Sequence, residues 1–267
     1  MKPLLKWVGG KTQILLNVLS TFPETIQTYH EPFVGGGSVL LAVLSRVTGA
    51  IYASDINPCV INFYSMVKSF PEHLIVCVQV LQTAYDTADD KEAFYYAMRD
   101  LFNNTSRDGP ESAALFLFLN KAGFRGLYRE GPNGFNVPFG HYKKITIAEE
   151  AHIRIVSKAI QRVVFRCQGF ESSLSHVKIG DFVYVDPPYV PESLTSFVGY
   201  VAGGFDKHAT LFDMLKQLPC SFVMSNSDVP VVRESFVGYT LRQIVAKRAI
   251  HSKDPSASTM ELLVSNS

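Results

Sequence analysis

The chain has few cysteines, and none of them form a C-x-x-C pair. They lie far apart in the sequence, which predicts buried free thiols in a reducing compartment and argues against both disulfides and a zinc site. These cysteines are Cys59, Cys77, Cys167 and Cys220. We therefore expect no metal ion.

Long apolar runs are also absent. No stretch is long enough to cross a bilayer, and the N-terminal residues lack the apolar segment of a signal peptide. We therefore expect a cytoplasmic protein with no membrane partner.

Neither sign of charge is in excess, because the net charge is +1. Any contact with nucleic-acid phosphates has to come from local clusters of basic side chains.

The chain does have enough apolar sequence for a large core, with 267 residues of which 47% are hydrophobic and 18% charged. Residues 58–157 have a mainly helical pattern, and a further helix is expected over 39–47. We predict an α/β fold with a mostly parallel sheet and an antiparallel pair formed by the last two strands. The predicted strands are 51–55, 163–166, 182–185, 221–224, 239–245 and 260–264.

The apolar run 182–185 ends in Asp186-Pro187-Pro188-Tyr189. Ionised Asp186 is a hydrogen-bond acceptor, the carbonyl of Pro187 is a second, and the prolines restrict the backbone so that both point one way. Tyr189 offers a flat surface on which a base can stack. Two acceptors on the hydrogens of an exocyclic amine localise its lone pair, so the motif favours chemistry on such an amine. Taken alone, it is also compatible with an ordinary Pro-Pro turn.

Glycines 35–37 lie between a short strand and a helix. A ligand can approach the backbone where side chains are missing, and Ser38 is predicted to cap the helix. Asp55 follows 18 residues after Gly37, at the end of the next strand, where a carboxylate of a doubly wound sheet binds a ribose diol. The combination predicts a nucleoside cofactor, and the lack of a full G-x-G-x-x-G pattern disfavours NAD.

Five motifs occur in the order found in Dam-type DNA adenine-N6 methyltransferases (D12 class, α group), which include DpnII-like and T-even phage enzymes. The chain resembles this family over almost its whole length. The motifs are Trp7-Val8-Gly9-Gly10-Lys11, Glu31-Pro32-Phe33-Val34-Gly35-Gly36-Gly37-Ser38, Asp55, Asn136-Val137-Pro138-Phe139-Gly140 and Asp186-Pro187-Pro188-Tyr189. The resemblance implies a Rossmann-like catalytic domain that binds S-adenosylmethionine, over residues 1–57 and 158–267. It also implies a mainly helical target-recognition domain inserted at 58–157.

The resemblance further implies methyl transfer from S-adenosylmethionine to N6 of an adenine flipped out of double-stranded DNA, within a GATC-like site. The implied catalytic residues are Asp186, Pro187 and Tyr189. The residues implied to bind the cofactor are Trp7, Lys11, Phe33, Gly35, Gly37, Ser38, Asp55, Phe170 and Asp186. The residues implied to bind DNA are Lys6, Phe124, Arg125, Arg129 and Tyr142, with Tyr200 as a second aromatic near the flipped base. Arg129 matches the arginine that reads guanine beside the target, and Phe124 matches an aromatic that enters the vacated stack.

Two positions depart from the family pattern. Gly169 stands where many members have an aspartate on the adenine amine of the cofactor, so Phe170 and backbone groups are expected to hold that ring. Arg125 stands where some members have asparagine, which leaves the outer base preference open.

Three alternatives also remain: a catalytically impaired DNA-binding protein, an N4-cytosine methyltransferase and an RNA adenine methyltransferase. The sequence leaves open a monomer or a weak dimer, and whether a restriction enzyme accompanies the chain.

Overall fold

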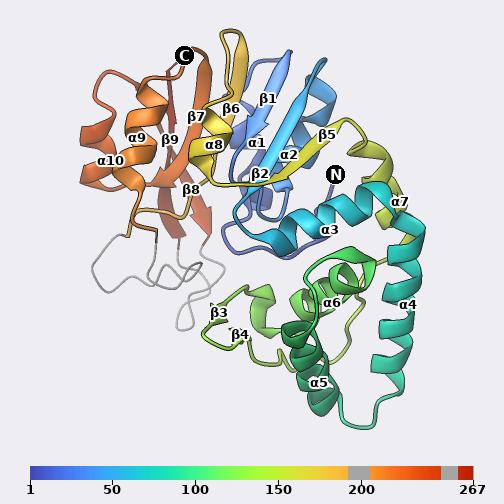
Figure 1. The fold of residues 1–267 in the computed structure, drawn as a ribbon. Coiled ribbons are helices and arrows are strands. Elements are labelled where there is room, and N and C mark those ends of the chain that lie inside the picture. Colours follow the sequence, from blue (N-terminus) through green and yellow to red (C-terminus); the bar gives the residue numbers. More distant parts are fainter. Residues whose placement is uncertain (192–204, 248–257, 267) are drawn as a thin grey trace.

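The computed structural model describes residues 1–191, 205–247 and 258–266. In this part of the chain seven strands form one sheet with the order β5-β2-β1-β6-β7-β9-β8 (Figure 1). They are β1 (Thr28–Glu31), β2 (Ile51–Asp55), β5 (Val163–Cys167), β6 (Asp181–Val185), β7 (Ser221–Ser227), β8 (Thr240–Lys247) and β9 (Ser258–Ser265).

Five neighbouring strands, from β5 to β7, are parallel, while β9 runs antiparallel to both β7 and β8. The mostly parallel sheet and the antiparallel pairing of the last two strands confirm the predicted fold. The insertion of β9 between β7 and β8 was not predicted.

The central strand β6 is buried on both faces. Phe182 and Tyr184 belong to the apolar core on one side of the sheet, and Val183 and Val185 belong to the core on the other. This alternation follows from the two-residue period of a strand. An uninterrupted apolar run is typical of a parallel strand covered by helices on both faces.

Short helices cover the two faces of the sheet (Figure 1). The first core contains residues of α1 (Leu15–Leu19), α2 (Ser38–Val43) and α3 (Pro58–Ser69). The second contains residues of α8 (Phe170–Leu174), α9 (His208–Lys216) and α10 (Pro230–Ser235). After α2, residues Leu44–Arg46 form a 3-10 helix, so the helix predicted over 39–47 is shorter than expected.

A group of helices and a small hairpin occupy the chain between β2 and β5. They are α4 (Pro71–Thr87), α5 (Lys91–Asn104), α6 (Gly109–Ala122), α7 (Glu150–Ala159), β3 (Glu130–Gly131) and β4 (Gly134–Phe135). Helix α6 packs against α3, α4 and α5 and is buried over most of its length. Helix α3 also packs on β2 and β5, where Tyr64 stacks on Phe165 with 5.4 Å between ring centroids. The mainly helical character of this segment agrees with the sequence pattern, while the domain boundaries stay a prediction.

The strand order changes direction between β1 and β6. From β1 the sheet continues through β2 to β5 on one side, and from β6 through β7 on the other. In open α/β sheets the carboxyl ends of two such strands border a crevice that binds ligands. The motifs containing Gly35 and Asp186 directly follow these two strands, so the topology brings them together.

All four cysteines are free, as predicted, but they are not all buried. Cys59 and Cys220 are buried, Cys77 is half-buried and Cys167 is exposed. The expectation that all four thiols are buried is therefore wrong for two of them.

Among the helices described, none combines the length and the apolar character that a membrane crossing requires.

Candidate active site

The centre of the site is an ion pair between Asp186 and Lys11. The Nζ atom of Lys11 lies 2.8 Å from Oδ1 of Asp186, and the lysine side chain is 3% exposed. The same ammonium donates a hydrogen bond of 2.6 Å to the carbonyl of Gly9 and lies 4.8 Å from the ring centroid of Tyr189. Two motifs that are distant in sequence are thus joined by a buried pair of opposite charges.

The charge of Asp186 depends on a balance between burial and Lys11. Burial raises the pKa of Asp186 to about 6, although the Lys11 ammonium favours the charged form. At pH 7 the carboxyl group is therefore mostly ionised and accepts hydrogen bonds without donating any.

A second carboxyl group, Glu31 at the end of β1, lies buried near Asp186. Burial raises the pKa of Glu31 to about 8, and the negative charge of Asp186 adds to this rise. The hydroxyl of Tyr29 donates a hydrogen bond of 2.6 Å to Oε2 of Glu31 and partly offsets it. At pH 7 Glu31 is mostly neutral, so of these two carboxyl groups it is Asp186 that carries the negative charge.

The backbone after Asp186 is fixed by residues of neighbouring elements. His208 of α9 donates a hydrogen bond of 2.9 Å to the carbonyl of Pro188, and Asn226 of β7 accepts one of 3.0 Å from the amide of Val190. The hydroxyl of Tyr189 donates a hydrogen bond of 2.7 Å to Glu261 of β9. Among the described residues, the carbonyl of Pro187 receives no hydrogen bond.

The glycine turn after β1 packs against Trp7 and Tyr64. Gly35 has φ +46°, and a Cβ atom there would lie 2.6 Å from Nε1 of Trp7. Gly37 has φ +70°, and a Cβ atom there would lie 2.6 Å from the hydroxyl of Tyr64. Glycine is thus required at these positions by backbone conformation and by protein side chains. The sequence suggested only the approach of a ligand.

The predicted capping role of Ser38 is wrong. Helix α2 begins at Ser38 itself, its N-cap residue is Gly37, and no side chain caps it. The Ser38 hydroxyl instead accepts a hydrogen bond of 3.1 Å from the backbone amide of Lys11. Ser38 therefore helps to hold the segment that carries the ammonium paired with Asp186.

Asp55 ends β2 beside the glycine turn. Its two oxygens accept hydrogen bonds of 2.9 Å from the amides of Gly35 and Asn57. Burial raises the pKa of Asp55, while these backbone hydrogen bonds lower it. The carboxyl group thus lies at the carboxyl end of its strand, where the sequence placed it, and it also stabilises the turn.

Aromatic rings gather beside the turn. Phe33 stacks on Phe170 with 5.7 Å between centroids, and Phe205 meets both rings edge-on. Next to them, a Cβ atom at Gly169 would lie 2.9 Å from Oε2 of Glu171. Glu171 also forms an ion pair of 2.6 Å with Lys207. A carboxylate therefore lies beside Gly169 although residue 169 has none.

The residues expected to bind DNA lie in two linked groups. In the first, the Lys6 ammonium lies 4.4 Å from the ring centroid of Tyr142, and the Tyr142 hydroxyl accepts a hydrogen bond of 2.9 Å from the amide of Arg125. Arg125 has φ 56°, a left-handed conformation that is uncommon for a residue with a side chain. Phe124 precedes it with 42% of its surface exposed.

The second group is formed by Arg129 and the hairpin. Arg129 donates two hydrogen bonds to Asn136, of 2.6 Å from Nε to the side-chain oxygen and of 3.1 Å from Nη2 to the carbonyl. The arginine side chain is exposed. Between the two groups, Tyr128 stacks on Trp7 at 6.1 Å and connects the hairpin to the glycine turn. Tyr200 lies outside the described residues.

Several polar residues of the site were missed from the sequence. Glu261, Asn226 and His208 hold the backbone or the ring of the Asp186 motif, yet none lies near it in the sequence. One signal was available in the sequence, because the predicted apolar strand 221–224 is followed directly by the polar residues Ser225, Asn226 and Ser227. The structure shows that these three residues end β7 and are buried. Buried polar residues at the carboxyl end of an apolar strand are typical of a site.

The seven-stranded sheet, with carboxylates at the carboxyl ends of β2 and β6, defines an α/β methyltransferase. The chain belongs to the D12 class N6 adenine-specific DNA methyltransferase family, which it matches over residues 7–250.

Similar proteins of known function agree with this assignment. A type II methyltransferase of Methanocaldococcus jannaschii, M.MjaIII, is 36% identical, with 100% of this chain and 99% of that protein aligned. The DNA adenine methylase of Haemophilus influenzae is 34% identical over 95% of this chain and 89% of its own. The retron Ec67 DNA adenine methylase of Escherichia coli is 33% identical over 98% and 90%.

The family confirms the activity that the resemblance implied. The enzyme is an adenine-specific DNA methyltransferase, and DNA is its substrate. Methyltransferases of this kind depend on S-adenosylmethionine in general. N4-cytosine methylation, RNA methylation and a purely DNA-binding role are therefore not supported. The GATC-like site, base flipping and the roles of individual residues stay predictions.

Proposed function

We propose that the enzyme transfers a methyl group from S-adenosylmethionine to N6 of an adenine flipped out of duplex DNA, within a GATC-like site. The ion pair between Lys11 and Asp186, 2.8 Å long, is the observation that carries the proposal. It keeps an acceptor charged directly after β6, three residues before Tyr189.

The donor groups around the crevice fit S-adenosylmethionine. Asp55 is placed for the ribose diol, and Phe33 and Phe170 for the adenine ring. Trp7, Lys11, Gly35, Gly37 and Ser38 form the remainder of the proposed cofactor site. When bound, the cofactor supplies an electrophilic methyl group on a positively charged sulfur. The negative charge of Asp186 attracts this sulfur electrostatically. Glu171 offers a carboxylate beside Gly169 for the exocyclic amine of the cofactor's adenine.

Asp186 and Pro187 act on the amine of the target adenine. The carboxylate of Asp186 accepts one hydrogen of that amine, and the carbonyl of Pro187 accepts the other. These hydrogen bonds would direct the nitrogen lone pair at the methyl group that bound S-adenosylmethionine supplies. The new nitrogen–carbon bond would replace the sulfur–carbon bond, the sulfur would leave as a neutral thioether, and the amine would lose one proton along its hydrogen bond to Asp186. The ring of Tyr189 stacks on the base, and its hydroxyl stays bonded to Glu261. Positioning and electrostatics provide the rate acceleration.

The exposed residues of the 121–144 segment contact the DNA. Arg129 uses the N–H edge of its guanidinium that Asn136 leaves free to bind the guanine beside the adenine. Phe124 enters the space that the flipped base leaves. Lys6, Tyr142 and Arg125 form a connected group that contacts the neighbouring sugar–phosphate backbone of the DNA. Residues 58–157 serve as the target-recognition domain, and residues 1–57 and 158–267 as the catalytic domain.

The direct test is a methylation assay with isotope-labelled S-adenosylmethionine. We expect label in N6-methyladenine after digestion of a duplex that contains GATC, with at least tenfold less label in a matched duplex that contains GTAC. A 2-aminopurine at the target position is expected to gain fluorescence on binding, since it leaves the stack. Equal label in the two duplexes would contradict the site preference, and no label in either would contradict the proposed reaction.

The ion pair predicts a specific dependence of methyl transfer on pH. We expect the wild-type rate to fall as the pH drops through about 6, because Asp186 must be ionised. Lys11→Met removes the charge that favours ionisation, so the inflection is expected to rise by about 1–3 pH units. At pH 7 this predicts a rate about 2- to 100-fold below wild type, with partial recovery at higher pH.

Lys68→Met is the matched control, since Lys68 of α3 is a part-buried lysine that donates a hydrogen bond to the carbonyl of Val163 in β5. It is expected to leave the inflection at about 6, the value for Asp186. A Lys11→Met enzyme that is slow at every pH with an unchanged inflection would show that Lys11 does not control the charge of Asp186.

A further inference from the structure

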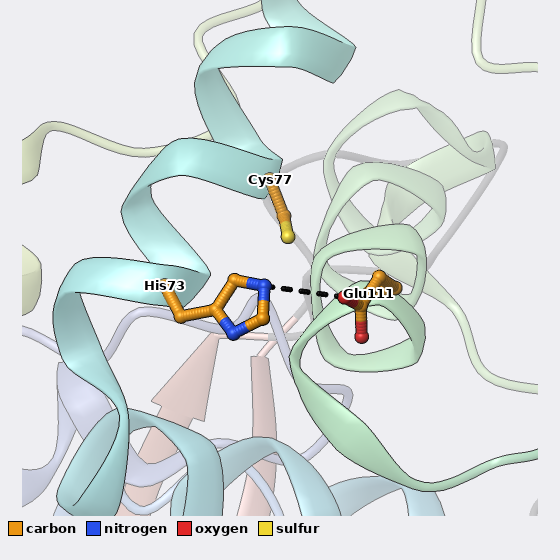
Figure 2. Close-up of side chains that lie close together, drawn as sticks. All are labelled: His73, Cys77 and Glu111. Carbon is orange, nitrogen blue, oxygen red and sulfur yellow. Dashed lines mark ion pairs between the residues drawn. The ribbon is translucent and has the colours of Figure 1, made fainter.

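Three potential metal ligands lie together between α4 and α6, outside the site of Asp186. They are His73 and Cys77 of α4 and Glu111 of α6 (Figure 2). One ligand atom from each lies within 4.8 Å of the other two. His73 and Cys77 are four residues apart and therefore project from the same face of the helix.

The distances suit a tetrahedral ion. The Nε2 atom of His73 lies 3.2 Å from Oε1 of Glu111. With metal–ligand bonds of about 2.0–2.2 Å, two ligands of a tetrahedral zinc ion are about 3.4 Å apart, which is close to this separation. The Cys77 sulfur points towards the same space in Figure 2 and lies within 4.8 Å of the other two ligand atoms.

The backbone that carries Glu111 is held in place. The side chain of Asn62 in α3 donates a hydrogen bond of 3.1 Å to the carbonyl of Gly109 and accepts one of 3.1 Å from its amide. Gly109 begins α6, so the first turn of that helix is anchored two residues before Glu111. The three ligands therefore come from two packed helices whose relative position is fixed by other contacts.

The contact between His73 and Glu111 does not by itself explain why three such side chains lie together. The side chains of His73 and Glu111 are 54% and 68% exposed, and exposed ion pairs contribute little to stability. The same exposure gives a metal ion free access and leaves room for water as a fourth ligand. Imidazole, thiolate and carboxylate together suit a borderline ion such as Zn²⁺ and do not suit Mg²⁺ or Ca²⁺.

We propose that His73, Cys77 and Glu111 bind one Zn²⁺ ion, with water as the fourth ligand, and that this ion ties α4 to α6. No sequence motif indicated this site, because Glu111 comes from a different helix than His73 and Cys77 and the ligands include no cysteine pair. Helix α6 leads directly into the segment that carries Phe124 and Arg129, so the ion would strengthen the support of that segment.

Metal binding to the full-length chain, stripped with a chelator and dialysed, tests the proposal without any assay of methyl transfer. We expect one Zn²⁺ per chain, and Co²⁺ in its place is expected to give a sulfur-to-cobalt charge-transfer band with the intense visible absorption of a tetrahedral site. Cys77→Ser should abolish the band, and His73→Ala or Glu111→Gln should weaken Zn²⁺ binding at least tenfold. Zn²⁺ should raise the thermal midpoint of the wild type by several degrees, and Mg²⁺ should not.

Matched variants separate this site from incidental thiol or imidazole binding. Cys167→Ser removes an exposed cysteine and His176→Ala an exposed histidine, and both are expected to retain the band and the affinity. Cys77→Ala serves as a second variant if Cys77→Ser folds poorly. A cobalt band that persists without Cys77, or a Zn²⁺ affinity unchanged in His73→Ala, would overturn the proposal.

Discussion

Asp186→Asn is expected to lower the rate of methyl transfer by about 10³-fold or more while duplex binding stays within about threefold of wild type. Asparagine has nearly the same shape, but it carries no charge and replaces one acceptor oxygen with an NH₂ donor. The variant is therefore expected to weaken the proposed hydrogen bond to the target amine and to remove the negative charge proposed to lie near the sulfonium. Single-turnover transfer of labelled methyl groups measures the chemical step separately from product release.

Asp181→Asn is the matched control for this substitution. Asp181 begins the same strand, β6, and accepts a hydrogen bond of 2.9 Å from His30 at the opposite end from Asp186. Its replacement changes a carboxylate on the same strand and is expected to leave methyl transfer within about threefold of wild type. A rate for Asp186→Asn within tenfold of wild type would show that the carboxylate does not activate the amine.

The loss of Asp186 also leaves Lys11 buried without its partner, which by itself destabilises a fold. The double variant Lys11→Met with Asp186→Asn removes both charges. We expect it to regain thermal stability relative to Asp186→Asn and to remain inactive. Recovery of activity together with stability would mean that Asp186→Asn had failed only through misfolding.

Arg129→Ala is expected to reduce discrimination at the guanine beside the target adenine by about 10- to 100-fold, corresponding to about 1–3 kcal/mol for a bidentate contact. Asn136 holds Nε and one terminal nitrogen of the guanidinium, so the side chain is oriented before DNA arrives. Arg129→Lys keeps the charge but not the planar fork, and it is not expected to restore discrimination. Competition between duplexes that differ only at this base pair measures the effect.

Lys143→Ala provides the comparison for a contact with phosphate. Lys143 is exposed in the same segment. Its loss is expected to weaken binding to all duplexes alike and to reduce the slope of log affinity against log salt concentration by about 1. If Arg129→Ala behaved in the same way, with discrimination unchanged, Arg129 would contact the DNA backbone and not a base.

Strands were the most predictable part of the fold. Apolar runs such as 182–185 identify a strand locally, and a proline pair directly after the run sets its end. The position of β9 was not predictable in this way, because its pairing with β7 joins residues that are separated by α10 and β8. Such a pairing depends on which sheet edge is free once the other strands have formed.

In the candidate site, too, single residues could be predicted from local motifs, while their partners could not. Asp186 and Lys11 were identified from their motifs, but their direct ion pair joins residues that lie far apart in the sequence, and a local pattern does not predict such a contact. Ser38 has a sequence context typical of a cap, yet its hydroxyl binds an amide that is 27 residues away in the sequence. A local pattern identifies which chemical groups are available, and long-range packing decides which partner each of them takes.

The central position of β9 also bears on the order of events during protein synthesis. Both sheet neighbours of β9, which are β7 and β8, emerge from the ribosome before it does, and they pair with it and not with each other. Glu261, which bonds the hydroxyl of Tyr189, lies on this late strand. The nascent chain thus holds Tyr189 without this hydrogen bond until translation has passed β9, so the proposed active site is complete only after that point.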